Sequence, residues 1–290
     1  HRRQRAPAVP PAGDLRRDGE RTAVSGSGSA DAETAAVLAL AVRLAREAGA
    51  LQRARYETEL RIDSKSRPID LVTEVDRACE ALVVDALRRE RPGDDVLAEE
   101  GGAHADAGAA FRWVVDPLDG TVNFAHGYPC FCVSIGVERD GVRHVGVVYD
   151  PLRDELFEAV RGSGARRNGQ PIRVSRTDTV QRALLATGFA YDVHDSADDN
   201  LDRLVRAVKR AGGVRRDGSA AIDLCYVACG RFDGFWERKL HPWDVAAGIL
   251  IVEEAGGRVT DLTGGPPPAS GREILASNAV LHDELVSLLR

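Results

Sequence analysis

Trp113-Val114-Val115-Asp116-Pro117-Leu118-Asp119-Gly120-Thr121 joins a short apolar strand to a turn that carries two carboxylates. The apolar residues predict a strand within a sheet, and Asp116 follows at the point where that strand ends and a cleft can open. Pro117 stiffens the turn, and Asp119 lies three residues beyond Asp116, so both carboxylates can face one cavity. The stretch therefore indicates an acidic site at the edge of a sheet.

The second half of this stretch supplies backbone groups. The Leu118 carbonyl is expected to lie outside the hydrogen-bonded ladder, where a metal ion can reach it. Gly120 and Thr121 are expected to open a helix, where backbone N–H groups can cradle a phosphate. Asp-Pro and Asp-Gly pairs are also common in ordinary turns, so this stretch is informative only together with the acidic residues elsewhere in the chain.

Three more segments place carboxylates beside the ends of predicted elements. Asp76 opens a helix, Glu99-Glu100-Gly101-Gly102 follows a strand, and Trp243-Asp244 opens another helix. Mg²⁺ prefers a few carboxylate oxygens together with water and phosphate oxygens, and a pair of such ions can clamp the attacking and leaving oxygens of a displacement. Any one of these acids alone would be a cap or a solvated residue. Their joint occurrence predicts a magnesium-dependent phosphate site.

Periodicity elsewhere predicts a layered mixture of helices and sheets. One helix is expected from Asp31, with Asp31 as its N-cap, and another from the capping box Thr73-x-x-Asp76 to a stop before Pro92-Gly93. Asp140-Gly141 predicts a hairpin turn within an antiparallel meander. The expected strands cover residues 96–98, 111–115, 130–138, 142–149 and 155–160, and later helices cover about 197–211, 219–229, 242–256 and 278–289. This order favours an α/β protein of the layered α+β kind over a pure βαβ winding.

The composition excludes several classes of protein. The 290 residues are 43% hydrophobic and 29% charged, with a net charge of −6, which gives no electrostatic footprint for nucleic acid. No apolar stretch reaches the ~20 residues that a membrane span needs. The five cysteines, at positions 79, 130, 132, 225 and 229, have the spacing of small buried hydrophobes. With no secretory signal in the chain, they indicate a reducing, cytoplasmic location.

The first thirty residues differ from the rest. Residues 1–30 are rich in Arg, Pro, Gly and Ser, a composition that cannot bury enough apolar surface to order itself, so a disordered N-terminal extension is expected there. Its basic side chains are compatible with contact to RNA. Residues 31–290 are expected to form the catalytic domain.

Several of these motifs match one known family. Asp116-Pro-Leu-Asp-Gly-Thr-Val-Asn-Phe124 continues through His126-Gly127-Tyr128-Pro129 and resembles the first signature of the inositol monophosphatase family, with Leu118 where that family usually has Ile. A second signature is similar to Trp243-Asp244-Val-Ala-Ala-Gly248 through Glu254-Ala-Gly-Gly257. Supporting motifs stand in the family's order and spacing from about residue 31 onward, at Lys65–Asp76, at Glu99-Glu100-Gly101 and at Gly218–Ala221. The resemblance implies a lithium-sensitive phosphatase with an alternating α-β-α-β-α sandwich.

The resemblance also implies the metal ligands. Two or three Mg²⁺ ions would be held by Glu99, Asp116, Leu118 (through its carbonyl), Asp119, Asp244 and Asp76. The first ion would bind Glu99, Asp116 and Leu118, and Asp116 would bridge to a second. A third, weaker ion would lie near Glu99 and Asp76. Thr121, hydrogen-bonded to Asp76, would orient a water on the first ion, and Lys65 matches a lysine on a mobile loop near the third.

The substrate contacts follow in the same way. Phosphate would bind the Gly120 and Thr121 amides, and the polyol would be contacted by Ser219, Ala220, Glu237 and Asp244. Glu237 matches the family's carboxylate that accepts hydrogen bonds from ring hydroxyls; a surface ion pair with Arg238 or Lys239 is the competing interpretation. For Ser219 and Ala220 the alternative is simple N-capping and close packing.

These features support more than one activity. The first hypothesis is a phosphatase for myo-inositol 1-phosphate or a related polyol phosphate. Histidinol phosphate is the second substrate considered, followed by fructose 1,6-bisphosphate, NADP and adenosine 3′,5′-bisphosphate, because the same metal ligands would serve each of them. A different class of function is a regulatory protein associated with RNA polymerase or RNA. Family members are commonly homodimers, and lithium sensitivity varies among them.

Overall fold

The computed structural model describes residues 27–104, 108–268 and 270–290. Within these ranges the α-helices are α1 (Ser27–Arg55), α2 (Glu74–Glu90), α3 (Thr121–Ala125), α4 (Leu201–Val208), α5 (Ala220–Ala228), α6 (Pro242–Glu254) and α7 (His282–Leu289), with a 3-10 turn at Val180–Arg182. None of these helices combines the length and the apolarity that crossing a lipid bilayer requires.

The strands of the described ranges form a small hairpin and two larger sheets. The hairpin and the eight-stranded sheet contain β1 (Ile62–Ser64), β2 (Leu71–Thr73), β3 (Asp95–Ala98), β4 (Gly102–His104), β5 (Phe111–Asp119), β6 (Cys132–Arg139), β7 (Val142–Asp150), β8 (Glu155–Val160), β9 (Ala165–Arg167) and β10 (Gln170–Pro171). The five-stranded sheet contains β11 (Leu184–Thr187), β12 (Gly213–Arg215), β13 (Gly234–Arg238), β14 (Arg258–Thr260) and β15 (Glu273–Ser277).

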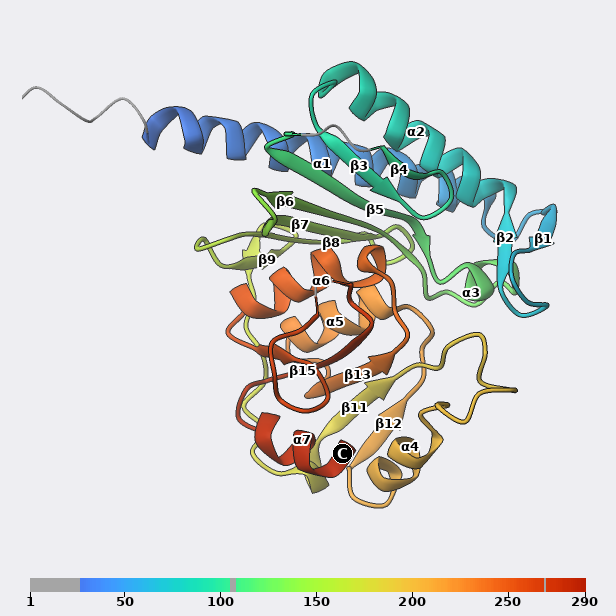
Figure 1. The fold of residues 1–290 in the computed structure, drawn as a ribbon, viewed down its shortest axis with the longest axis vertical. Coiled ribbons are helices and arrows are strands. Elements are labelled where there is room, and N and C mark those ends of the chain that lie inside the picture. Colours follow the sequence, from blue (N-terminus) through green and yellow to red (C-terminus); the bar gives the residue numbers. More distant parts are fainter. Residues whose placement is uncertain (1–26, 105–107, 269) are drawn as a thin grey trace, which may run out of the picture.

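These elements stack in alternating layers (Figure 1). Helices α1 and α2 cover one face of the eight-stranded sheet, and α5 and α6 cover its other face. The five-stranded sheet lies beyond α5 and α6, with α4 and α7 on its outer side. This order of layers confirms the sandwich predicted from the sequence. It arises because each sheet has apolar side chains on both faces and must cover both of them.

The meander predicted in the middle of the chain is present. Strands β5 to β10 pair antiparallel in sequence order, and β3 joins the other side of β5 in parallel. Asp140 and Gly141 have φ angles of 50° and 75° and join β6 to β7. Both residues adopt the left-handed region that a two-residue hairpin turn requires, which is why this dipeptide was a reliable signal.

The capping box at Thr73 is also confirmed. The Asp76 Oδ2 atom accepts hydrogen bonds from the Thr73 backbone N–H at 2.8 Å and from its hydroxyl at 2.6 Å. Thr73 Oγ1 in turn accepts from the Val75 N–H at 3.1 Å. These bonds satisfy groups that the helix start would otherwise leave unpaired, so α2 begins where the motif predicts. It ends at Glu90, two residues before Pro92.

The start of α1 differs from the expectation. The helix begins at Ser27, so Asp31 lies inside it and is not its N-cap, and residues 27–30 are helical although they were assigned to the disordered extension. Once a helix has nucleated, each further residue adds one hydrogen bond at small cost, which allows it to extend beyond its apolar stripe. The rest of the predicted extension, residues 1–26, lies outside the described residues.

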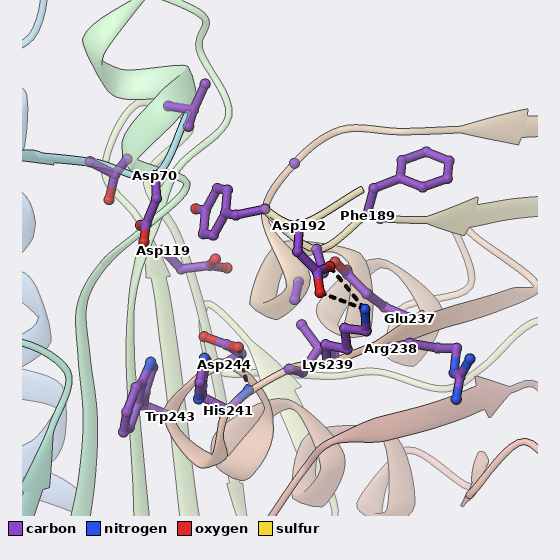
Figure 2. Close-up of a pocket in the computed structure, with 18 of the residues that line it drawn as sticks. Asp70, Asp119, Phe189, Asp192, Glu237, Arg238, Lys239, His241, Trp243 and Asp244 are labelled. Carbon is purple, nitrogen blue, oxygen red and sulfur yellow. Dashed lines mark hydrogen bonds and ion pairs between the residues drawn. The ribbon is translucent and has the colours of Figure 1, made fainter. Parts of the chain in front are cut away.

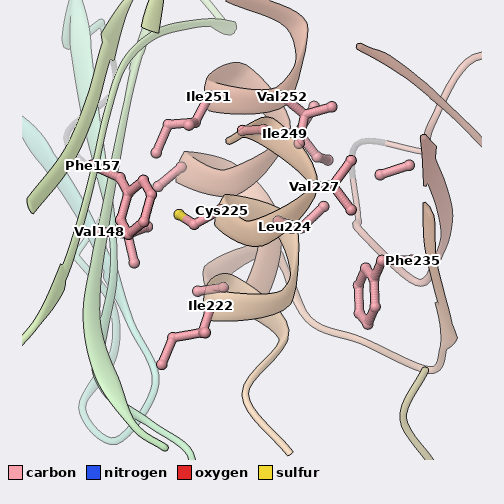
Figure 3. Close-up of a cluster of buried hydrophobic side chains, with 14 of the residues drawn as sticks. Val148, Phe157, Ile222, Leu224, Cys225, Val227, Phe235, Ile249, Ile251 and Val252 are labelled. Atoms are coloured by element: carbon pink, nitrogen blue, oxygen red, sulfur yellow. The ribbon is translucent and has the colours of Figure 1, made fainter. Parts of the chain in front are cut away.

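The centre of the molecule is the layer formed by α5 and α6 (Figure 3). Leu224, Cys225 and Ile249 are buried there between Val148 and Phe157 of the eight-stranded sheet and, on the other side, Phe235 of the five-stranded sheet. A helix enclosed by two sheets is apolar all round, unlike a surface helix. The cysteines are free thiols, and all except the partly exposed Cys229 are buried, as their spacing predicted.

A buried histidine in the last helix predicts a pH dependence of stability. His282 is fully buried, with Nδ1 2.8 Å from Ser277 Oγ and Nε2 2.8 Å from Thr260 Oγ1. Burial lowers the pKa of His282 to about 4, and Arg258 lowers it further while Asp283 opposes the shift. The unfolded chain, where a histidine titrates near pH 6.5, therefore binds a proton that the folded protein excludes. Stability is retained above pH ~6.5 and falls between there and the folded pKa.

We expect urea unfolding at pH 7 and pH 5 to measure this loss. His282 should contribute about 2 kcal/mol to the decrease in the free energy of unfolding between these two pH values. In His282→Gln that share of the decrease disappears, whereas the exposed His194, changed to Gln as a control, leaves it intact. An identical decrease in His282→Gln and the unmodified chain would contradict the assignment.

Candidate active site

The predicted site residues meet at one cavity. It has a volume of about 940 Å³, and ten of the residues singled out in the sequence line it: Lys65, Glu99, Asp116, Leu118, Asp119, Gly120, Thr121, Ala220, Glu237 and Asp244. Figure 2 shows Asp119, Glu237 and Asp244 around this space. They come from the eight-stranded sheet, the five-stranded sheet and the first turn of α6. Asp76 and Ser219 are not part of the lining and are almost completely buried behind it.

A β-bulge shapes the turn that carries Asp116. In the pairing of β5 with β6, Asp116 is opposite Ser134 and Asp119 is opposite Cys132. The two residues between them on β5, Pro117 and Leu118, therefore lie opposite a single residue of β6. Leu118 is therefore outside the ladder, as expected. Its N–H donates to Asp116 Oδ1 at 3.0 Å, and its carbonyl oxygen lies 3.1 Å from Thr121 Oγ1.

Gly120 provides the tight bend between β5 and α3. Its φ angle is 97°, in the left-handed region, and a Cβ at this position would lie 2.8 Å from the Cys130 carbonyl oxygen. Any other residue would meet both backbone strain and a steric clash. The bend allows Thr121 to begin α3 directly beside the carboxylates, as the sequence predicted.

Asp119 is held from the opposite side of the cavity. Its Oδ2 atom accepts from the Ser219 hydroxyl at 2.6 Å and from the Ala221 N–H at 2.8 Å, both at the start of α5. Burial raises the pKa of Asp119, and these hydrogen bonds oppose the shift. Ser219 also accepts from the Ile222 N–H, which makes it the N-cap of α5. The capping alternative is therefore present, and Ser219 reaches the cavity only through Asp119.

Asp76 and Thr121 form the predicted pair. The Thr121 hydroxyl donates to Asp76 Oδ1 at 2.7 Å. The other carboxylate oxygen of Asp76 is occupied by Thr73, so both oxygens accept from protein donors. This geometry suits an orienting role for Asp76 and gives no support to its predicted contact with a third ion. Because the hydroxyl proton of Thr121 is directed to Asp76, the Thr121 oxygen can accept from a water in the cavity.

Glu99 lies in the turn after β3 and is paired with the predicted lysine. Lys65 Nζ is 2.8 Å from Glu99 Oε1 and also contacts Glu100. Burial raises the pKa of Glu99 to about 7, and Lys65 opposes that shift. Although burial disfavours the ammonium, Glu99 and Glu100 raise the pKa of Lys65 above its ordinary value. Glu99 is thus a carboxylate with one cationic neighbour.

Asp116 and Asp244 have no such cationic neighbour among the residues that the structure describes. Burial raises the pKa of Asp116 well above its usual range, and Glu99, Asp119 and Asp244 raise it further. Burial also raises the pKa of Asp244, while the His241 N–H, which donates to its Oδ2 atom at 2.7 Å, opposes the shift. Uncompensated buried negative charge of this kind is stabilised by a bound cation.

The carboxylates around the cavity suit Mg²⁺, because several of them lack a compensating charge. Glu99, Asp116 and Asp244 each keep one carboxylate oxygen that has no hydrogen-bond partner in the described part of the chain. Carboxylate oxygens are the ligands that this hard cation prefers. In residues 27–104, 108–268 and 270–290 no group of three or more acidic, His or Cys side chains could hold a metal ion as it stands. Like charges repel, so cation binding would draw these side chains closer together.

Glu237 lies at the end of β13 on the far side of the cavity. Burial raises its pKa to about 8, with Arg216 opposing the shift and Asp119 adding to it. Arg238 pairs with Asp198 and Glu273, and Lys239 pairs with Asp192, so the competing ion-pair interpretation of Glu237 is not what the structure contains. The carboxylate fits there because Gly188 has no side chain: a Cβ at Gly188 would lie 2.2 Å from Glu237 Oε1.

Comparison with known proteins accounts for this arrangement. Residues 33–290 match the model of the inositol monophosphatase family. The chain belongs to this family. The inositol-1-monophosphatase of Synechocystis is 49% identical over 228 residues, covering 79% of each chain. The Nus factor SuhB of Escherichia coli is 42% identical over 263 residues, covering 88% of this chain and 98% of the relative.

The solved structures give the same result. The inositol monophosphatase of Anabaena has a TM-score of 0.80 and 44% sequence identity, and the match covers 89% of this chain and 96% of that one. As a member of the inositol monophosphatase family, the protein is a phosphatase.

Some cavity residues of this inositol monophosphatase-family protein carried no sequence signal. Phe189 and Tyr191 line the cavity from the loop after β11, where no motif stands out. Lys239 Nζ holds that loop, at 2.9 Å and 2.7 Å from the two Asp192 carboxylate oxygens (Figure 2). Each contact depends on a loop conformation, which periodicity does not encode.

Proposed function

We propose that this phosphatase hydrolyses myo-inositol 1-phosphate or a related polyol phosphate to the free alcohol and phosphate. The observation that carries the proposal is the position of the Glu237 carboxylate, which is half-buried and lines the same cavity as Asp116 and Asp244. One part of the cavity is therefore suited to cations and a phosphate, and another offers a strong acceptor to hydroxyl groups. The family membership and the relative named inositol-1-monophosphatase support the same substrate class.

Mg²⁺ is the proposed cofactor. Glu99, Asp116 and the Leu118 carbonyl would hold one ion, and Asp116, Asp119 and Asp244 a second. When bound, these ions supply charge neutralisation and a more acidic water. The donor-poor setting of Asp116 and Asp244 supports this assignment, since each has a raised pKa and an oxygen free of protein partners.

The protein's own groups then position the reaction. Thr121 would accept a hydrogen bond from the attacking water, because its own proton is donated to Asp76. The Gly120 and Thr121 amides would bind the phosphate at the start of α3. Lys65, paired with Glu99, would favour the ionised form of that carboxylate. Glu237 and Ala220 would contact the polyol, with Glu237 accepting from its hydroxyls.

Histidinol phosphate is the second candidate substrate. Its ammonium group could pair with an ionised Glu237 in the place of a hydroxyl. A regulatory role with RNA polymerase or RNA is the proposal from another class, and the relatives named Nus factor SuhB motivate it. We also propose a cytoplasmic location and a homodimeric assembly. Only the family resemblance supports these two points.

A phosphate-release screen of the purified protein separates the substrates. It would compare inositol, histidinol, sugar and nucleotide phosphates at saturating Mg²⁺. We expect the highest kcat/KM for inositol 1-phosphate. A clear preference for histidinol phosphate or a nucleotide would overturn the first assignment and support its alternative.

Glu237→Gln tests the polyol contact directly. The amide keeps the shape of the carboxylate but is a weaker acceptor, and hydrogen bonds to charged groups contribute about 1.5–3 kcal/mol. We expect kcat/KM for inositol 1-phosphate to fall by about 10- to 100-fold, with turnover of an aryl phosphate unchanged. The control is Glu273→Gln on the neighbouring strand β15, whose side chain contacts Arg238 and does not line the cavity. Equal losses on both substrates would refute the role of Glu237.

A further inference from the structure

The last turn of α1 carries a polar side chain in a position that belongs to the core. Gln52 has no exposed surface, and it continues the buried stripe formed by Val37, Ala41, Leu44 and Ala48. An apolar residue is expected at such a position, because burying an amide carries a desolvation cost. The contacts of Gln52 indicate what offsets that cost.

Gln52 uses its donors and leaves its acceptor unpaired. Its Nε2 atom donates to the Pro117 carbonyl at 2.8 Å and to the Cys132 carbonyl at 3.3 Å. Its Oε1 atom is buried and has no hydrogen-bond partner in the described part of the chain. The reverse orientation of the amide would set an oxygen against two carbonyl oxygens, so only this orientation is favourable. The side chain thus connects α1 to both strands, β5 and β6, at the bulge.

The Pro117 carbonyl belongs to the same peptide unit as the Leu118 N–H. That N–H donates to Asp116 Oδ1 at 3.0 Å. Because a peptide unit is planar, rotating its carbonyl away from Gln52 also rotates its N–H away from Asp116. Hydrogen bonds at the two ends of one peptide also polarise and strengthen each other. Gln52 and Asp116 are therefore linked through a single rigid group.

The surrounding strand does not hold this peptide. The register of β5 with β6 pairs Asp116 and Asp119 but leaves Pro117 and Leu118 outside the ladder. Proline has no N–H to donate, so Pro117 makes no ladder hydrogen bond of its own as a donor. The orientation of the peptide must come from side chains, and Gln52 is the side chain bonded to its carbonyl.

We propose that Gln52 is a positioning residue that sets the direction of the Asp116 carboxylate through the Pro117–Leu118 peptide. The proposal rests on the proposed function for the view that Asp116 is a metal ligand. Residues behind a metal ligand typically influence metal affinity or activity by about 10- to 100-fold. An apolar side chain of similar shape at position 52 removes the unpaired Oε1 acceptor but also removes the donor to the buried Pro117 carbonyl, so the two effects on stability oppose each other.

Gln52→Met is the informative variant, because Met has a similar length and no amide. In the metal-free protein we expect hydrogen exchange of the Leu118 amide, followed by NMR, to become at least about tenfold faster, with amides in the pairing of β7 and β8 unchanged. The temperature of unfolding should change little, because the variant removes one unpaired acceptor and leaves the Pro117 carbonyl without its donor. Mn²⁺, used as a spectroscopic probe, should bind about 10- to 100-fold more weakly, while KM for the phosphate ester at saturating Mg²⁺ is unchanged.

Val37→Ala is the matched control on the same helix. It removes buried apolar volume 15 positions away and should lower the unfolding temperature without changing Leu118 exchange or Mn²⁺ affinity. Unchanged Leu118 exchange in Gln52→Met, or failure of that variant to fold, would overturn the proposal. If exchange accelerates but the unmodified protein binds no Mn²⁺ and releases no phosphate, the positioning role stands and the proposed function fails.

Discussion

Asp116→Asn is expected to reduce magnesium-dependent phosphate release by about a thousandfold or more. Asp116 is the carboxylate proposed to contact both ions, and the transition-state stabilisation that a metal site supplies amounts to several kcal/mol, where each ~1.4 kcal/mol is a factor of ten. The substitution replaces a buried anion by a neutral amide of the same shape. The measurement is kcat/KM for inositol 1-phosphate over a titration of Mg²⁺.

The structure offers a matched control for this substitution. Asp150 is also a buried aspartate at the end of a strand, where it accepts from the Leu152 and Arg153 N–H groups and pairs with the Arg153 side chain outside the cavity. Asp150→Asn should therefore retain near-normal kcat/KM. Substantial magnesium-dependent turnover in Asp116→Asn would count heavily against the proposed mechanism.

Gly146→Val is expected to cause a large loss of stability. Gly146 lies in β7 facing α6, and a Cβ there would be 2.7 Å from the Ala247 carbonyl oxygen and 3.2 Å from Ala247 Cα. These are backbone atoms of a helix held between two sheets, so they cannot move aside separately. We expect a destabilisation of about 3 kcal/mol or more, which for a chain of this size lowers the unfolding temperature by about 10 °C.

The direction of this effect opposes local preference, which makes the test specific. Valine favours a strand more than glycine does, so strand propensity alone predicts a gain in stability. Gly93→Val is the control, because no atom lies within 4 Å of a Cβ at that exposed glycine. Thermal unfolding of the two variants measures the difference. An unchanged unfolding temperature in Gly146→Val would show that α6 does not pack as closely as described.

Helix α6 also connects this packing to the site. Asp244 stands in its first turn and lines the cavity, so a displaced helix would displace a proposed metal ligand. Gly146 therefore supports the site indirectly, through the contact between β7 and α6, although it has no polar group. No sequence motif marks this role.

Short-range patterns in the sequence predicted several features correctly. The capping box Thr73-x-x-Asp76 placed the start of α2, and Asp140-Gly141 placed the hairpin between β6 and β7. The run Asp116–Thr121 predicted a strand end, a residue outside the ladder and a helix start. Each of these signals lies within a few neighbouring residues, where backbone dihedrals and local hydrogen bonds decide the conformation.

The family signatures extended this to the whole fold and to the cavity lining. They did not show how individual side chains are engaged. That both carboxylate oxygens of Asp76 are engaged, by Thr73 and Thr121, emerges only from the structure. The same holds for the bond of the Ser219 hydroxyl to Asp119, 100 positions earlier in the chain.

The amino-acid sequence by itself thus determined the order of the elements, the acidic residues that gather at one cavity, and the membership of the inositol monophosphatase family. Only the tertiary structure decided which donors hold each carboxylate, why Gly188 leaves room for Glu237, and how Gln52 reaches a peptide 65 positions away. The physical reason is that these contacts join segments distant in the chain. Their geometry depends on the packing of α1, α5 and α6 against the sheets, which local periodicity does not encode.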